Sequence, residues 1–193
     1  MASKALPPLE AGCVYRTRDF EPWSTNPPRL AKRLVERGVL VRVAQGLFAC
    51  PKRSKFGVVP PGDDALMKAF LEGSPFVFTG PERWNALGLG ATALFAAPLV
   101  YNIKRSGVFE LGGRRFELRR VPFPQVPSPE WFVVDLFENA ERAGTSRTEL
   151  AGALSRALAR GSFDRERLGA MAQRYGTKAT RVLVYSALQD VAV

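Results

Sequence analysis

Apolar and polar side chains follow the period of an α-helix between residues 26 and 38. At roughly 100° per residue, one side of this segment is apolar and carries Leu30, Ala31, Leu34 and, at its border, Val35. The opposite side is polar and mostly basic, with Arg29, Lys32, Arg33 and Glu36. Asn26 is a favoured N-cap residue, Pro27 fits the first helical position, and Gly38 fits the position after the last turn. The pattern therefore predicts a helix that packs on one side and is basic on the other.

The residues after this helix change from a helical to an alternating pattern. They predict a two-stranded hairpin, with one strand at residues 39–43, a turn at residues 44–46 and a second strand at residues 47–49. Arg42 and Gln45 lie at or near the exposed end of this hairpin.

Over residues 18–51, a short helix, a turn, the basic helix and the small hairpin follow one another. This order is typical of a winged helix-turn-helix, which places its second helix in the major groove of DNA while the hairpin, or wing, reaches a neighbouring backbone or minor groove. The candidate DNA-binding residues are Arg16, Arg18, Thr25, Asn26, Arg29, Lys32, Arg33, Arg42 and Gln45. Residues 16, 18, 25 and 26 would add phosphate contacts near helix termini. A plainer interpretation stays open, in which these charges form the solvated face of an ordinary amphipathic helix.

The middle of the chain has the pattern of a small α+β unit. Residues 52–62 are a basic segment with Pro and Gly, which we interpret as a connector at the first domain boundary. Asp63 and Asp64 follow it, and they either cap a short helix or, in principle, offer metal ligands. A later helix opens at Pro81, and residues 112–113 are a Gly-Gly pair suited to the turn of a β-hairpin.

From residue 130 onward the pattern is helical. Ser146 and Glu149 form a capping box at the start of one helix, and Asp164 is the N-cap of the next. The predicted fold class is α+β. Three domains are expected: a winged helix-turn-helix DNA-binding domain at residues 1–58, an α+β middle domain with a β-hairpin at residues 59–128, and a C-terminal helical bundle at residues 129–193.

The positive charge of the chain is concentrated at its N-terminal end. Of the net charge of +10, residues 1–58 contribute +7, from 11 Lys and Arg against 4 Asp and Glu. Residues 59–128 contribute +2 and residues 129–193 contribute +1. The N-terminal third is therefore expected to attract phosphate and to bind in a salt-sensitive way, whereas the rest is better suited to contacts with protein.

The chain contains no histidine, so the commonest general base and metal ligand is missing. Sites built only from carboxylates or Lys stay open, with Glu82, Glu110 and Glu117 as candidates, but we expect no enzymatic activity, no cofactor and no metal. Cys13 and Cys50 are too few for a disulfide scaffold and are expected to be ordinary thiols of a cytoplasmic protein. We expect no signal peptide, because the first residues lack an apolar stretch, and no membrane span, because no apolar run is long enough.

Two blocks of sequence resemble the AbiEi family of antitoxins, the transcriptional-regulator half of abortive-infection toxin–antitoxin pairs. RLAKRLVERGVLVRVAQGLFACP is similar to the family's second DNA-binding helix, glycine, Leu-x-Arg strand and Gly-Leu/Ile-[YF] wing return. FVFTGPERWNALGLG is similar to its Thr-Gly…Leu-Gly-Leu segment, and a late hairpin ending in RRFELRRV follows. The resemblance covers roughly residues 14–123. The chain departs from the family at residues 6–13, where two Pro and one Gly leave little room for a full first helix.

The resemblance implies a winged helix-turn-helix that represses its own operon by binding inverted repeats of double-stranded DNA. It also implies a C-terminal region that counteracts a nucleotidyltransferase-like toxin encoded nearby, without necessarily binding it. The DNA-contacting role would fall on Arg29, Lys32, Arg33, Arg42 and Gln45. Two other functions stay open, namely a protein-interaction module that uses the helical C-terminal region and a binder of structured RNA.

Overall fold

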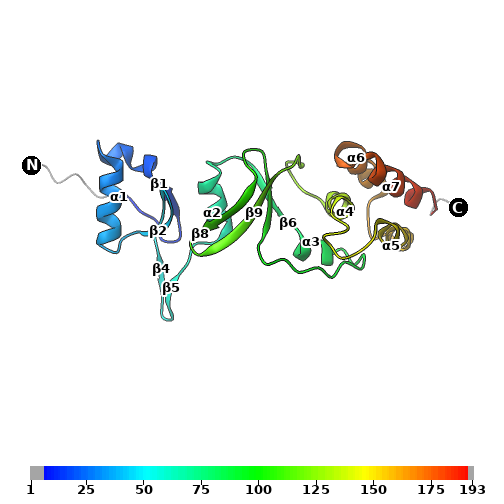
Figure 1. Ribbon diagram of the computed structural model, residues 1–193, viewed down its shortest axis with the longest axis horizontal. Helices are drawn as coiled ribbons and strands as arrows, with labels where there is room; N and C mark the ends of the chain where they lie inside the picture. Colours follow the sequence, from blue (N-terminus) through cyan, green and yellow to red (C-terminus); the bar gives the residue numbers. More distant parts are fainter. Residues whose placement is uncertain (1–6, 191–193) are drawn as a thin grey trace, which may run out of the picture. The chain divides into compact units, whose positions relative to one another are not determined.

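The computed structural model describes residues 7–190 and divides the chain into two compact units (Figure 1). The N-terminal unit contains the chain up to Phe76 together with Val108–Phe116, and the C-terminal unit contains Val77–Gly107 and the chain from Glu117 onward. The fold is mixed α and β, as expected. The boundaries expected after residues 58 and 128 stay predictions, and residues 1–6 and 191–193 of the outer domains lie outside the described residues.

The N-terminal unit begins with a strand, a short helix, a longer helix and a hairpin. These elements are β1 (Val14–Arg16), the 3-10 helix η1 (Thr17–Trp23), α1 (Pro27–Glu36), β2 (Val41–Ala44) and β3 (Leu47–Ala49). The three strands form an antiparallel sheet in the order β1-β3-β2. The sequence pattern did not reveal β1, which is only three residues long and lacks an alternation of buried and exposed positions.

The boundaries and the buried side of α1 confirm the sequence prediction. The Asn26 side chain accepts a hydrogen bond from the Arg29 backbone N–H at 3.1 Å, and Pro27 is the first helical residue. Gly38 follows the C-cap with φ of 70°, and its N–H donates to the Val35 carbonyl at 2.9 Å. The core under the helix consists of Phe20, Leu30, Ala31, Leu34 and Leu40.

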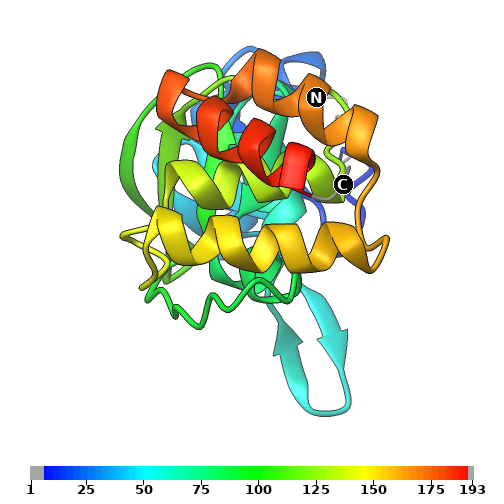
Figure 2. The same cartoon turned by 90° about the vertical axis from the view of Figure 1, so that its right-hand side faces the viewer.

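The prediction of a connector at residues 52–62 is wrong for most of this segment. Residues there form a β-hairpin, β4 (Lys52–Ser54) and β5 (Gly57–Val59), which projects from the N-terminal unit (Figures 1 and 2). The Ser54 hydroxyl accepts from the Phe56 N–H at 3.2 Å and donates to the Gly57 carbonyl at 3.1 Å, which closes a tight turn. All the strand residues are exposed, so the hairpin lacks the alternation of apolar and polar positions that would have predicted it.

Helix α2 (Asp63–Phe70) comes next, and its N-cap is Gly62. The expected capping by Asp63 or Asp64 is therefore wrong, because both residues lie in the first turn. Asp63 instead makes a two-pronged ion pair with Arg114, at 2.6 and 2.8 Å.

The third sheet has the strand order β6-β7-β9-β8. Its strands are β6 (Phe76–Thr79), β7 (Leu99–Asn102), β8 (Gly107–Leu111) and β9 (Arg114–Arg120). Strands β8 and β9 are the hairpin expected around Gly112 and Gly113, while β7 and β9 run parallel. Helix α3 (Pro81–Asn85) opens at Pro81, as expected.

Four helices complete the C-terminal unit: α4 (Pro129–Glu138), α5 (Arg147–Ala159), α6 (Arg165–Tyr175) and α7 (Lys178–Asp190). The capping box of Ser146 with Glu149 and the N-cap Asp164 confirm the sequence prediction. Helix α4 packs against α6, and α5 packs against α7. These helices share one core with residues of the segment 77–107, called the middle segment below, including Trp84, Leu99 and Tyr101.

Candidate nucleic-acid interface

The exposed side of α1 carries three basic side chains, Arg29, Lys32 and Arg33. Their spacing of three and four residues makes them neighbours on the helix surface. The Lys32 side chain is 79% exposed, and its Nζ lies 3.9 Å from the Glu36 carboxylate, which is a weak, solvent-screened pair. Among residues 7–190, Arg29 and Arg33 have no acidic partner. Two guanidinium groups on a rigid helix are therefore available to an anion.

Four further predicted residues lie before α1 or at its start. Arg18 and Thr25 are exposed, on η1 and in the turn that separates η1 from α1. Asn26 is also exposed, but its side-chain oxygen is occupied by the N-cap hydrogen bond. Arg16 is placed differently, because its guanidinium forms an ion pair with Glu72 and its side chain is only 26% exposed. Of the predicted basic residues between positions 16 and 33, the exposed ones therefore lie on η1 and α1.

The β2–β3 hairpin, which was expected to be the wing, is short and attached to its surroundings. The two predicted residues on it are exposed, Arg42 and Gln45. The Thr17 N–H donates to the Gly46 carbonyl at 3.0 Å, and the Gly112 N–H donates to the Val43 carbonyl at 2.7 Å. Both edges of the hairpin are therefore held near its turn by neighbouring segments of the same unit.

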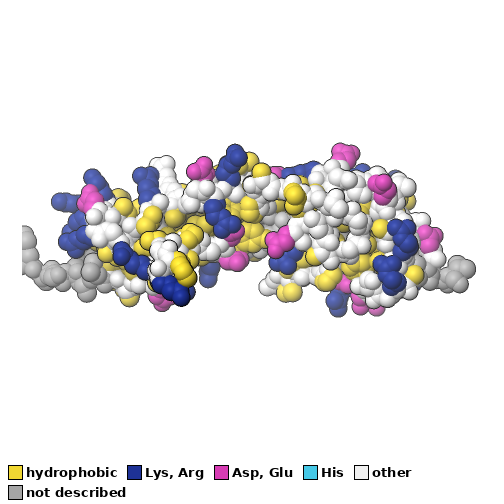
Figure 3. Space-filling view, turned by 90° about the horizontal axis from the view of Figure 1, so that it is seen from below, with side chains coloured by type: hydrophobic (Ala, Val, Ile, Leu, Met, Phe, Trp, Pro, Cys, Tyr) yellow, Lys and Arg dark blue, Asp and Glu magenta, His cyan; other side chains and the backbone are white. Residues whose placement is uncertain are grey.

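Sequence reasoning missed the basic side chains of the β4–β5 hairpin. Lys52, Arg53 and Lys55 are exposed, and Phe56 at the turn is 88% exposed, with Lys55 Nζ 5.0 Å from its ring centroid. In the view from below, basic side chains border apolar ones on this hairpin (Figure 3). The basic composition and the Ser-Lys-Phe-Gly sequence of the turn are the signals in this segment that could indicate a basic hairpin.

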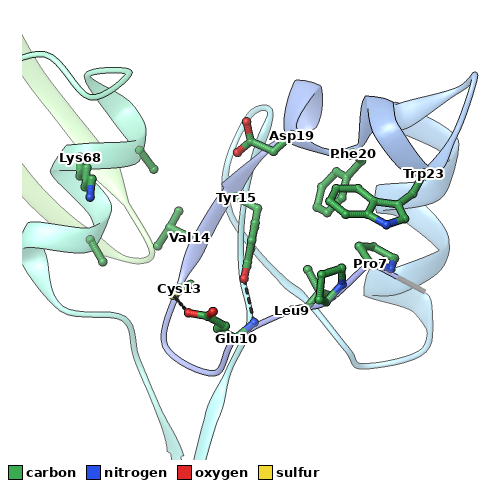
Figure 4. Close-up of a pocket in the computed structure, with 13 residues that line it drawn as sticks. Pro7, Leu9, Glu10, Cys13, Val14, Tyr15, Asp19, Phe20, Trp23 and Lys68 are labelled. Atoms are coloured by element: carbon green, nitrogen blue, oxygen red, sulfur yellow. Dashed lines mark hydrogen bonds between the residues drawn. The ribbon is translucent and has the colours of Figure 1, made fainter. Parts of the chain in front are cut away.

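A groove with mostly apolar walls lies elsewhere in the N-terminal unit (Figure 4). Its volume is about 620 Å³, and its lining includes Leu9, Tyr15, Phe20, Trp23 and, from α2, Lys68. Residues 7–13 contain no helix, and the groove is lined by this segment together with residues of β1, η1 and α2. Leu9 and Tyr15 also pack against the core beneath α1.

The groove holds one thiol, Cys13, whose Sγ donates to a carboxylate oxygen of Glu10 at 3.7 Å. Burial, together with this contact, raises the pKa of the Cys13 thiol. A raised pKa keeps the thiol protonated and poorly nucleophilic. Cys13 and Cys50 are both free thiols, as expected.

The C-terminal unit contains a buried carboxylate, Asp135, which is 5% exposed. One of its oxygens accepts hydrogen bonds from the Thr79 hydroxyl and from the Trp84 Nε1–H, the latter at 2.8 Å. Asn139 Nδ2 donates to the other oxygen at 3.1 Å and to the Tyr101 hydroxyl at 3.0 Å. Burial raises the pKa of Asp135 above its ordinary value, against the lowering effect of these bonds. Because both oxygens are occupied by donors from the protein, this network ties β6, α3 and α4 together.

Among residues 7–190, no three metal-binding side chains come together, and no helix combines the length and apolar character needed to cross a bilayer.

Comparison with known proteins shows a similarity in fold to one solved structure. No family model matches the chain, and no curated protein matches its sequence. Among solved structures, the chain is similar to the Rv2827c protein from Mycobacterium tuberculosis, with a TM-score of 0.52 and 14% sequence identity over 93% of this chain and 72% of that one. At this level of identity, the likeness concerns the fold alone.

Proposed function

We propose that this protein is a sequence-specific, non-enzymatic DNA-binding regulator of antitoxin type, with a winged helix-turn-helix in its N-terminal unit. The observation that carries the proposal is the exposed basic side of α1, where Arg29 and Arg33 have no acidic partner among residues 7–190. The opposite side of the helix is buried in the core, so these guanidinium groups are presented by a rigid element.

The order of the elements supports this function. Helix η1 precedes α1 across a turn at residues 24–26, so η1 stands where a helix-turn-helix has its first helix. Strands β2 and β3 follow α1, and β3 lies between β1 and β2 in the sheet. In a winged helix-turn-helix, the helix in the position of α1 enters the major groove.

The proposed contacts divide into two kinds. Arg29, Lys32 and Arg33 would read base edges or bind phosphates from α1. Phosphate contacts would come from Arg18, Thr25 and Asn26 near the helix termini and from Arg42 and Gln45 on the β2–β3 hairpin. Arg16 would join them only after releasing Glu72.

The antitoxin part of the proposal rests on the resemblance to the AbiEi family. By that resemblance, the protein represses its own operon at inverted repeats and counteracts a nucleotidyltransferase-like toxin encoded nearby. The cytoplasmic location that we propose rests on the two ordinary thiols. The near-neutral C-terminal part of the chain suits this second role better than DNA binding.

Gel shifts with DNA from upstream of the protein's own gene, at several salt concentrations, test the DNA-binding role. Arg33→Ala is expected to weaken binding by about 1 to 3 kcal/mol if Arg33 reads a base, or to reduce the salt slope by about one unit if it contacts phosphate. Arg156→Ala removes an exposed arginine of α5 and serves as the matched control. Absence of binding by the wild-type protein at low salt would overturn the proposal.

Co-expression with the product of the adjacent gene tests the antitoxin role. Relief of growth arrest by the wild-type protein would support it. Co-purification with that product, unaffected by changes at Arg29, Lys32 and Arg33 and without DNA binding, would instead favour a protein-interaction module. Competition between duplex DNA and structured RNA separates the RNA-binding alternative.

A further inference from the structure

The β4–β5 hairpin is an uncovered β-ribbon that leaves the sheet directly after β3 (Figures 1 and 2). All of its strand residues are exposed, and Phe56, Val58 and Val59 are 88%, 61% and 39% exposed. An isolated two-stranded ribbon is only marginally stable. Covering its exposed apolar side chains lowers the free energy. The ribbon therefore has the properties of a segment that contacts a partner.

The charge of this region indicates what kind of partner it is. Between Glu36 and Asp63 the sequence contains no acidic residue and five basic ones: Arg37, Arg42, Lys52, Arg53 and Lys55. Three of these lie on the ribbon or at its turn, and none of the three has an acidic partner within residues 7–190. A polyanion complements such a surface, whereas a neutral or basic protein surface does not.

The position of the ribbon connects it to the proposed DNA-binding helix. Ala49, the last residue of β3, pairs with Val41, which is the first residue of β2 after α1. The ribbon therefore leaves the sheet at the end where the chain enters from α1. The β2–β3 turn lies at the other end of the sheet. There, the backbone N–H groups of Thr17 and Gly112 donate to the carbonyls of Gly46 and Val43. Of these two hairpins, the ribbon is the one that extends away from its unit.

We propose that the β4–β5 hairpin is a second DNA-binding element, whose cations bind phosphates along the edge of a minor groove while Phe56 enters that groove. Lys52 and Arg53 lie on β4 and Lys55 lies at the turn, so the basic groups are on one side of the aromatic side chain, and β5 on the other side carries no charge. Minor-groove proteins commonly combine basic side chains with an inserted apolar wedge such as Phe. This inference rests on the proposed function, because it assumes that duplex DNA is the ligand.

The test measures binding of the full chain to upstream DNA over about 50 to 200 mM salt. Replacing Lys52, Arg53 and Lys55 together by Gln is expected to reduce the slope of log affinity against log salt by about 2 to 3 units, since each lost phosphate contact removes about 0.9. The matched control replaces Arg156, Arg160 and Lys178 of the C-terminal helices by Gln, which changes the net charge equally. Phe56→Ala is expected to weaken binding about tenfold without changing the slope.

Competition with a minor-groove ligand tests whether the ribbon enters the minor groove of DNA. Distamycin, which occupies the minor groove, is expected to weaken binding of the wild-type protein and to have little effect on a variant that replaces Lys52, Arg53 and Lys55 by Gln and also Phe56 by Ala. Equal competition against both proteins, or against neither, would overturn the assignment to the minor groove.

The outcomes separate this inference from the proposed function. If the wild-type protein binds and Arg33→Ala weakens binding, but the ribbon variant behaves like the matched control, only the inference about the ribbon is wrong. If the wild-type protein does not bind DNA at low salt, both proposals are wrong. All the replaced side chains are exposed, so thermal unfolding of the variants is expected to match that of the wild type.

Discussion

Asn26 shows how one side chain fixes the start of the proposed DNA-binding helix. Its oxygen accepts the backbone N–H of Arg29, which no carbonyl within the helix satisfies. Asn26→Ala is therefore expected to lower the free energy of unfolding by about 1 kcal/mol, measured by urea denaturation followed by circular dichroism. Asn26→Asp keeps the acceptor and is expected to cost much less. Thr25→Ala is the matched control, because Thr25 is exposed and caps nothing in the described chain. Equal losses in all three variants would contradict a capping role.

Asp135 illustrates a residue whose burial makes stability depend on pH. Asp135→Asn places an amide N–H₂ among donors and is expected to lower the free energy of unfolding by about 2 kcal/mol. Because burial raises the folded-state pKa above the ordinary value of 3.8, the folded protein keeps this proton where the unfolded chain has lost it. The stability linked to this proton is thus fully present below pH 3.8 and is lost as pH rises through the folded-state pKa. The difference in stability between wild type and variant, measured by urea denaturation, is expected to narrow as pH rises above about 4.

The pKa of Glu149 is shifted in the opposite direction to that of Asp135. A backbone hydrogen bond from Ser146 lowers the pKa of Glu149 below its ordinary value of 4.5. The stability from this carboxylate is therefore present above pH 4.5 and is lost as pH falls through the lowered pKa. For Glu149→Gln, the difference in stability from wild type is expected to widen as pH rises through the lowered pKa towards 4.5 and to stay constant above it. If both variants followed the same trend, the assigned directions of the pKa shifts would be wrong.

At the scale of elements, the β4–β5 hairpin is expected to contribute little to folding. Replacing residues 52–59 by a short Gly-Ser loop removes only exposed residues of the two strands and their turn, so the free energy of unfolding is expected to change by less than about 1 kcal/mol. Phe20→Ala in η1 is the contrasting variant, because Phe20 is 1% exposed and its loss is expected to cost about 3 to 5 kcal/mol. Calorimetry of both variants measures the difference. A large destabilisation by the loop replacement would show that the hairpin has a structural role.

The elements that could be predicted from sequence are those whose local signals agree with their packing. Helix α1 has a cap, a buried stripe and a terminal glycine, so its bounds and its basic side follow from the sequence. Strand β1 and the β4–β5 hairpin have three-residue strands without alternation of buried and exposed positions, so only the turn sequence of the hairpin is a local signal. The Arg16–Glu72 ion pair joins residues far apart in the sequence, so its effect on a candidate site residue could not be foreseen.

At the scale of the whole molecule, the cores of the two units predict which part of the chain folds without the C-terminal helices. The core beneath α1 uses only residues of the N-terminal unit. Trp84, Leu99 and Tyr101 of the middle segment instead share a core with α4–α7. A fragment of residues 1–128 is therefore expected to keep the N-terminal unit and its proposed DNA binding, while β6, β7 and α3 lose their packing.

Tryptophan fluorescence measures this outcome directly. In a Trp23→Phe background, the fragment has Trp84 as its sole tryptophan, and this side chain is fully buried in the intact chain. Its emission is expected to shift to the wavelength of water-exposed indole in the fragment. The full chain with Trp23→Phe and Trp131→Phe is the control, in which Trp84 stays buried and its emission stays blue-shifted. If the fragment kept a blue-shifted Trp84 and unfolded cooperatively, the middle segment would be a domain of its own and residue 128 would mark its boundary.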